Sequence, residues 1–246
     1  MRPEISINPA VDSLAALEGK LLQPAGLDLS QVDRALSSLM TRQLTYGDIY
    51  FQFKRFETWS IEDGIVKDGV HSVDQGVGVR AVSGERTGFA YSDQLDAAAL
   101  DDAVGAARGI ARSQGVGRAK ITQPTSTHKL YPTDDPSKSL DDVDKVELLL
   151  SLDSEVRSLD DRVIQVIGSI ASVFEMILVQ GSDGILAADI RPLVRLNVSV
   201  ITEKDNRREQ GYAGFGGRGD LSLLTSREKV CSVAKEAVRQ AAVNME

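Results

Sequence analysis

Apolar residues along this chain follow two periods. In several segments they recur every three or four positions, which predicts amphipathic helices. In others they alternate with polar residues and are rich in β-branched and aromatic types, which predicts strands. The strands are expected within 49–91 and from about Val163 to Phe215. The helices are expected to begin near Asn8, Ser30, Ser92, Ser139 and Thr225.

Turn-forming residues divide both strand regions. The triplets Glu62-Asp63-Gly64, Lys67-Asp68-Gly69 and Ser83-Gly84-Glu85 favour tight turns, so the first region is predicted to be an antiparallel meander. The expected strands of the second region are Phe174–Gln180, Ile185–Ile190, Leu193–Thr202 and Gln210–Phe215.

The two strand regions contain an internal repeat. Asp63-Gly64-Ile65 recurs as Asp183-Gly184-Ile185, and Gly88-Phe89-Ala90 recurs as Gly211-Tyr212-Ala213, each followed by a loop and an alanine-rich helix. We infer a β-β-β-α unit that is used twice. Because each unit has one apolar sheet face and one apolar helix stripe, the expected fold is α+β with two layers, an antiparallel sheet with helices packed on one face.

A stretch rich in proline and polar residues divides the sequence near its middle. Residues 115–139 contain Pro124, Pro132 and Pro136 among serines, threonines and charges, which is typical of a linker. We therefore expect N-terminal helices and the first repeat in 1–114, a linker in 115–139 and the second repeat in 140–246.

Composition and charge narrow the functional classes. The chain has 246 residues, 42% of them hydrophobic, and a net charge of −8, which makes nucleic acid a poor partner. No apolar run approaches the length of a membrane span, and the N-terminus lacks an apolar signal core. The single cysteine, Cys231, excludes an internal disulfide. A cytoplasmic protein without membrane contact is expected.

No residue pattern predicts a catalytic, cofactor or metal site in this chain. The histidines, His71 and His128, lack ligand spacing, and no serine or cysteine has the surroundings of a nucleophile. Acidic pairs such as Asp134-Asp135 and Asp160-Asp161 are more typical of solvated helix ends than of acid/base catalysis.

Two glycine patterns are candidates for binding loops. Gly76-x-Gly78 lacks the third glycine and the following helix of a dinucleotide site, so a bulge or a close backbone approach is favoured. The glycines at 214, 216, 217 and 219 lack the lysine of a phosphate loop. They are expected to form a mobile connection, with a loop lining a peptide groove as the alternative.

Long runs of strand sequence carry a family resemblance. Tyr46–Gln52, Glu62–Lys67, Asp74–Asp93 and Arg191–Leu196 resemble the TldD/PmbA family of zinc metallopeptidases, also called modulators of DNA gyrase, and its TldD side in particular. Leu130-Tyr131 and Asp135-Pro136 extend the match, so that it covers nearly the whole chain.

The resemblance implies a cytoplasmic peptidase that trims unfolded peptides, as in peptide-antibiotic maturation and antitoxin removal, together with its paralogue TldE (PmbA). Members of the TldD type hold zinc with a His-Glu-x-x-x-His helix and a later cysteine in their carboxyl-terminal half, and nothing in this chain matches those positions. The apolar stripe of the last helix continues almost to Glu246 without a closing glycine. We therefore expect a truncated N-terminal portion that folds, binds no zinc, cleaves nothing alone and forms part of the substrate cavity wall.

Two other functions remain open at this point. The chain could be a non-catalytic module that binds peptide or a partner along exposed sheet edges. It could also regulate DNA gyrase through a protein partner, as the second family name suggests.

Overall fold

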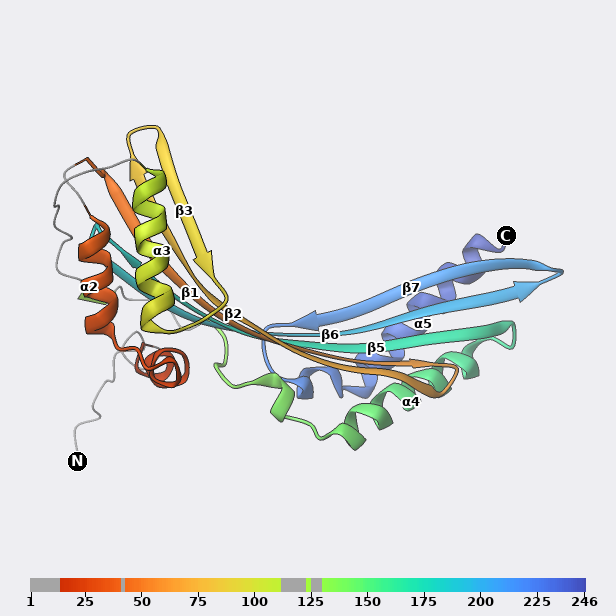
Figure 1. Ribbon diagram of the computed structural model, residues 1–246. Helices are drawn as coiled ribbons and strands as arrows, with labels where there is room; N and C mark the ends of the chain where they lie inside the picture. Colours follow the sequence, from red (N-terminus) through yellow and green to blue (C-terminus); the bar gives the residue numbers. More distant parts are fainter. Residues whose placement is uncertain (1–13, 41–42, 112–122, 125–129) are drawn as a thin grey trace, which may run out of the picture. The chain divides into compact units, whose positions relative to one another are not determined.

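The computed structural model describes residues 14–40, 43–111, 123–124 and 130–246. The strands are β1 (Tyr46–Glu62), β2 (Ile65–Ser83), β3 (Arg86–Ser92), β4 (Gln123–Pro124), β5 (Val163–Gly181), β6 (Ile185–Lys204) and β7 (Arg207–Gly217) (Figure 1). The helical elements are η1 (Glu18–Leu22), η2 (Gln23–Ala25), α2 (Leu29–Leu39), α3 (Ala97–Ile110), η3 (Pro136–Lys138), α4 (Asp142–Leu159), η4 (Leu221–Leu224) and α5 (Arg227–Asn244).

The strands form one hydrogen-bonded sheet. Its order is β3-β2-β1-β5-β6-β4, and β7 also pairs with β6. The β2–β3 and β6–β7 ladders are antiparallel, and the two-residue strand β4 adds a parallel pair with Ile185 and Leu186 of β6. The predicted antiparallel sheet is therefore confirmed, with a short parallel addition.

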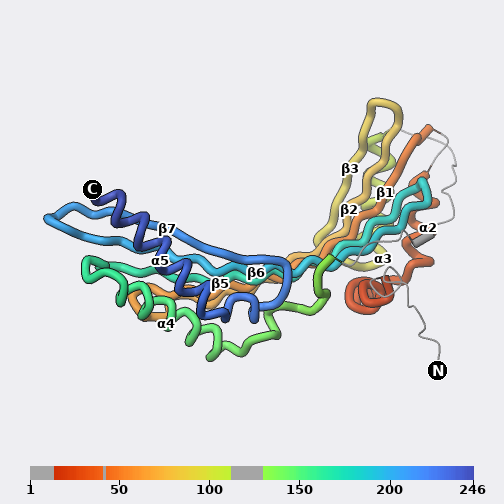
Figure 2. The backbone as a smooth tube through the Cα atoms, turned by 180° about the vertical axis from the view of Figure 1, so that it is seen from behind, coloured from red at the N-terminus to blue at the C-terminus, as the bar shows by residue number. Residues whose placement is uncertain are grey.

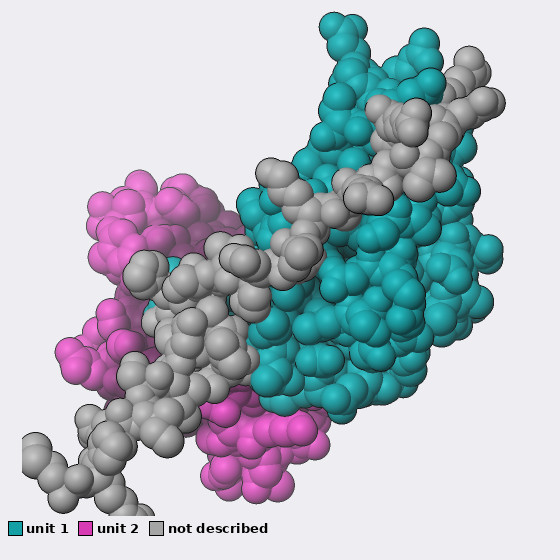
Figure 3. Space-filling view, turned by 90° about the vertical axis from the view of Figure 1, so that its left-hand side faces the viewer, with its two compact units in different colours: residues 1–54, 73–130, 175–190 teal, residues 55–72, 131–174, 191–246 magenta. Residues whose placement is uncertain are grey.

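The chain forms two compact units, shown separately in Figure 3. Unit 1 comprises residues 1–54, 73–130 and 175–190, and unit 2 comprises 55–72, 131–174 and 191–246. Each of the long strands β1, β2, β5 and β6 contributes a segment to both units. The units are therefore interleaved in sequence, whereas the predicted division into 1–114, 115–139 and 140–246 is contiguous. The contiguous division into 1–114, 115–139 and 140–246 remains a proposal for how the repeat is arranged along the chain.

Helices cover one face of the sheet in each unit. In unit 1 helix α3 packs on β3 and on α2, and in unit 2 helix α5 packs on β7 and on α4. Figure 2 shows α5 following β7 along its length. Along β6 every second residue from Leu186 to Thr202 is buried. In unit 2 the buried face of β6 joins apolar residues of α4 and α5 in one core. These features confirm the α+β two-layer fold.

The repeated glycines are the points where each helix meets its strand. A Cβ on Gly88 would lie 2.1 Å from the carbonyl oxygen of Ala107, and a Cβ on Gly211 would lie 1.8 Å from that of Ala237. Each glycine thus allows the helix backbone to approach a strand more closely than a side chain permits. The repeat in the sequence is therefore a repeated packing contact, in β3–α3 and again in β7–α5.

Turn predictions were correct at most positions. Asp63-Gly64 lies between β1 and β2 with positive φ at both residues (51° and 71°), and Gly184 (φ 92°) lies in the corresponding turn between β5 and β6. The predicted turn at Lys67-Asp68-Gly69 is wrong, because these residues continue β2. Glycine is favoured at position 69 for another reason, since a Cβ there would lie 3.2 Å from the indole ring of Trp59.

Two strand predictions also need correction. Ile185–Ile190 and Leu193–Thr202 belong to one strand, β6, which runs through Pro192. Pro192 is tolerated because β7 pairs with Val194–Lys204 and β4 with Ile185–Leu186, so neither covers position 192. The glycines at 214, 216 and 217 lie in β7 and do not form a mobile loop. At Gly216 a Cβ would lie 2.2 Å from the carbonyl oxygen of Val194.

The predicted helices are present but begin at other caps. Asp28, with Gln31, forms the capping box of α2, while Asp96 caps α3 and Asp141 caps α4 through their carboxylates. Helix α5 begins after Ser226. The expected start at Asn8 lies outside the described residues. None of the described helices combines the length and apolar character needed to cross a membrane.

We predict that Gly88→Ala destabilises the protein by about 1–3 kcal/mol, because the added methyl group collides with the backbone of α3. Gly105→Ala is the matched control, since Gly105 lies in the same helix with nothing within 4 Å of the added carbon. It should leave stability unchanged or raise it by up to about 1 kcal/mol. Urea unfolding measures both, and equal effects would contradict the packing contact.

Candidate functional site

The face of unit 1 away from the helices carries a groove. Val77, Val79 and Ala81 of β2 are buried, so the alternate residues Gly76, Gly78 and Arg80 lie on the open face. On β3, Gly88 faces α3. Because successive residues of a strand point to opposite faces, Phe89 and Tyr91 lie on the open face. Gly78 pairs with Tyr91, and Arg80 pairs with Phe89.

Gly76 and Gly78 of β2 line this groove, which we call the Gly76–Gly78 groove. Its volume is about 300 Å³, and its lining includes Tyr50, Asp74, Gly78, Phe89, Tyr91 and Asp93. A Cβ on Gly76 would lie 2.6 Å from the Ser92 carbonyl oxygen, and one on Gly78 would lie 3.3 Å from the Phe89 ring. The predicted close backbone approach at Gly76-x-Gly78 is thus confirmed.

Aromatic rings form the exposed side of the groove. Phe89 is 57% exposed and Tyr91 79% exposed, and their rings stack with centroids 6.4 Å apart. Aromatic side chains rarely remain this exposed on a sheet without a partner to cover them, because their burial is among the larger apolar gains available. The pair is consequently a candidate binding surface.

Beside the groove, Arg80 is held by an anion and a ring. Its guanidinium donates two hydrogen bonds to a carboxylate oxygen of Asp48, and it lies 5.6 Å from the centroid of Tyr46. The hydrogen bonds and charge of Asp48 raise the pKa of Arg80 above its ordinary value. Burial, followed by the charges of Asp48 and Asp183, raises the pKa of Tyr46.

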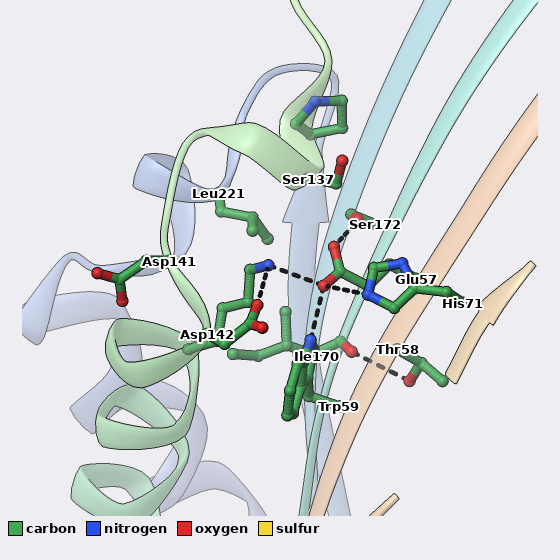
Figure 4. Close-up of polar contacts among 12 residues, drawn as sticks. Glu57, Thr58, Trp59, His71, Ser137, Asp141, Asp142, Ile170, Ser172 and Leu221 are labelled. Carbon is green, nitrogen blue, oxygen red and sulfur yellow. Dashed lines mark hydrogen bonds and ion pairs between the residues drawn. The ribbon is translucent and has the colours of Figure 1, made fainter. Parts of the chain in front are cut away.

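A buried charged cluster lies in unit 2 (Figure 4). Glu57 is 2% exposed, and its Oε1 lies 2.7 Å from Lys145 Nζ, 2.7 Å from Trp59 Nε1 and 3.2 Å from His71 Nε2. Its other oxygen accepts a weak bond from Ser172 Oγ at 3.5 Å. The carboxylate therefore has donors on both oxygens, as a buried charge requires.

Lys145 is the cation that balances this carboxylate. It is 3% exposed, and its Nζ also lies 3.2 Å from Asp142 Oδ1. Burial alone would lower the pKa of Lys145, but the hydrogen bonds and charges of Glu57 and Asp142 outweigh burial and raise it. Lys145 thus stays protonated at neutral pH, which suits a structural ion pair and not a basic catalyst.

The charged residues of this cluster do not fit a metal. The ammonium group of Lys145 lies between Glu57 and Asp142, where an ion would have to sit to use both carboxylates. Within the described ranges no group of three or more histidine, cysteine, aspartate or glutamate side chains is arranged to hold a metal. We therefore derive no metal-dependent step from these residues.

Three of the candidate residues from the sequence, His71, Asp135 and Asp160, each contact a charged side chain. His71 lies against Glu57, whereas His128 is outside the described residues. Asp135 pairs with Arg55 and caps η3, and Asp160 pairs with Arg162, whose hydrogen bond lowers the pKa of Asp160.

Sequence reasoning missed both the Glu57–Lys145 pair and the aromatic pair. Glu57 and Lys145 lie 88 positions apart, so no local pattern joins them. The aromatic pair had a usable signal, because Gly88 and Ala90 alternate with Phe89 and Tyr91. When small residues pack on a helix, the large residues between them must face outward.

Comparison with known proteins places this fold in a class of peptidase domains. Residues 47–111 match the family model described as PmbA/TldA metallopeptidase domain 1, and residues 135–245 match the one described as PmbA/TldA metallopeptidase central domain. The chain belongs to the PmbA/TldD family.

Its sequence relatives include proteins named metalloprotease TldD homolog. The one from Haemophilus influenzae is 41% identical over 241 residues, which cover 94% of this chain and 49% of that protein. The one from Buchnera aphidicola is 38% identical over 217 residues, covering 86% and 45%. The chain thus spans about half the length of these curated relatives.

Solved structures share the fold at low sequence identity. A protein from Bacteroides thetaiotaomicron, described as a modulator of DNA gyrase, aligns with a TM-score of 0.70 at 13% identity, over 87% of this chain and 49% of that one. TldE from Thermococcus kodakarensis aligns with a TM-score of 0.60 at 14% identity, over 87% and 47%.

We predict that Lys145→Met lowers the free energy of unfolding by about 3–5 kcal/mol, because Glu57 would remain buried without its cation. The double variant Glu57→Gln/Lys145→Met should recover part of this loss. Lys138→Met, at an exposed position in the same unit, is the control. A double variant no more stable than Lys145→Met would show that the unpaired charge is not the cause.

The same pair predicts a pH dependence. Because the folded pKa of Lys145 is raised above 10.5, its contribution is fully present below that value and is lost as pH rises through the folded pKa. The stability difference between wild type and Lys145→Met should therefore stay constant from about pH 7 to pH 10 and shrink only above about pH 10.5. A difference that shrinks near neutral pH would contradict this assignment.

Proposed function

We propose that this chain is the N-terminal, peptide-holding portion of a TldD-type zinc metallopeptidase. In this proposal the intact protein degrades or trims unfolded peptides, with its zinc bound by residues outside this chain. A paralogue of the TldE type is its partner, and the complex works in the cytoplasm. Family membership and the names of the sequence relatives support the peptidase class.

The observation that carries the peptide-holding role is the Gly76–Gly78 groove. An extended peptide is bound by surfaces that offer exposed apolar area together with polar groups that fix its position. Phe89 and Tyr91 supply the apolar area, and Gln52, Asp74 and Asp93 supply polar groups in the same groove. The groove therefore has both parts of a peptide site.

This chain contributes binding and not bond cleavage in the proposed enzyme. Its strongly held charged groups, Arg80 with Asp48 and Lys145 with Glu57, are already paired within the protein. The rigid sheet keeps the groove in one shape, so a bound peptide is held without ordering a loop. When bound, zinc supplies Lewis-acid polarisation of the peptide carbonyl and activation of water in such enzymes.

We predict that a short, labelled, unstructured peptide binds this chain saturably with a chelator present, as measured by fluorescence anisotropy. The double variant Phe89→Ala/Tyr91→Ala should weaken binding about tenfold or more, because it removes the exposed rings. Tyr212→Ala is the matched control, since Gly211-Tyr212-Ala213 is the equivalent segment of the second repeat. No binding, or equal loss in the control, would contradict a peptide site in this groove.

We further predict that this chain alone gives no chelator-sensitive cleavage of a fluorogenic peptide, even with zinc added. The intact protein with its paralogue should cleave, lose activity on chelation and regain it when zinc is restored. Chelator-sensitive cleavage by this chain alone would falsify the division of roles. Cleavage by the intact protein that survives chelation would contradict the zinc enzyme.

A further inference from the structure

Two carboxylates in the Gly76–Gly78 groove have no partner within the described part of the protein. Asp74 lies on the open face of β2, two residues before Gly76, and Asp93 follows β3 directly. Neither forms a hydrogen bond or ion pair with any described residue, and the described residues that line the groove include no lysine, arginine or histidine. Among the described residues, the groove is therefore lined by acidic side chains and by no basic one.

Aromatic rings accompany these carboxylates. Tyr50 lines the groove from β1, and Phe89 and Tyr91 line it from β3. A cation over an aromatic face is attracted by the ring, and the aliphatic stem of lysine or arginine gains apolar contact with the same ring. Rings and carboxylates together thus match a basic side chain better than an acidic or a purely apolar one.

The same face already contains such a pairing within the chain. Arg80, two residues beyond Gly78, is bonded to Asp48 and lies over the ring of Tyr46. There the cation comes from the protein itself. In the groove, by contrast, the lining residues that the structure describes supply anions and rings but no cation.

Exposed acids are usually only solvated, and that explanation must be weighed here. It does not account for the aromatic pair, which is 57% and 79% exposed beside the acids. Exposed rings and acids without a described partner occur in one place, which indicates a surface built to be covered.

We propose that the Gly76–Gly78 groove binds an arginine or lysine side chain of an extended peptide. The rings of Phe89 and Tyr91 contact its aliphatic stem, and Asp74 and Asp93 bond its cationic head. The inference rests on the proposed peptide-holding function and adds a preference for basic residues. It makes Asp74 and Asp93 specificity-determining residues.

The test compares two labelled peptides of glycine, serine and alanine, one with a single central arginine and one with citrulline in its place. Citrulline has nearly the same shape without the charge. The arginine peptide should bind about tenfold more tightly, and added salt should reduce this preference. Asp74→Asn/Asp93→Asn should abolish the preference.

Asp101→Asn/Asp102→Asn is the control, because it removes the same charge from α3, on the helix side of the same unit. It should leave the preference intact. Equal binding of the two peptides, with both weakened by Phe89→Ala/Tyr91→Ala, would overturn the basic preference and leave the peptide-holding function standing. If neither of these peptides binds, nor the labelled peptide of the earlier test, both proposals fail.

Discussion

The close approach of a helix backbone to a glycine on a neighbouring strand is the contact on which this structure depends. Gly88 under α3 and Gly211 under α5 leave no room for a side chain, so each helix packs directly against its strand. Because strand residues alternate between faces, fixing glycine toward the helix turns the next residue to the other face. Phe89 and Tyr212 are exposed for this reason. The packing of the core and the chemistry of the open face are thus consequences of one contact.

The two units share this helix–strand contact but differ in where their charged pairs lie. In unit 2 the buried layer includes a charged pair, Glu57 with Lys145, joined by Trp59, His71 and Ser172. Burying such a pair gives little net stability compared with apolar packing, whereas breaking it is costly. We infer that the pair favours one arrangement of β1 against α4, since other arrangements would leave a charge without a partner. In unit 1 the Arg80–Asp48 pair lies beside the groove instead, with the Arg80 side chain half exposed and Asp48 buried.

The proposed function follows from what lies beside those open-face charges. The groove offers rings and carboxylates on a rigid sheet, so a peptide could be oriented there without a change in the backbone. Such a surface fits the proposal that this chain holds peptide in a metallopeptidase of the PmbA/TldD family.

The sequence by itself determined the periodicity, the repeat and the α+β class, because these depend on alternation and on local turn chemistry. It also indicated the family, through the resemblance of its long strand runs to family members. The sequence predicts the Asp63-Gly64 turn because aspartate and glycine tolerate the positive φ angles that this turn requires. Lys67-Asp68-Gly69 contains the same Asp-Gly pair yet continues β2, because pairing within the sheet overrides the local turn preference there. The groove and the Glu57–Lys145 pair were likewise decided only by the tertiary structure. Both join residues distant in sequence, and strand pairing and helix packing set which of them meet.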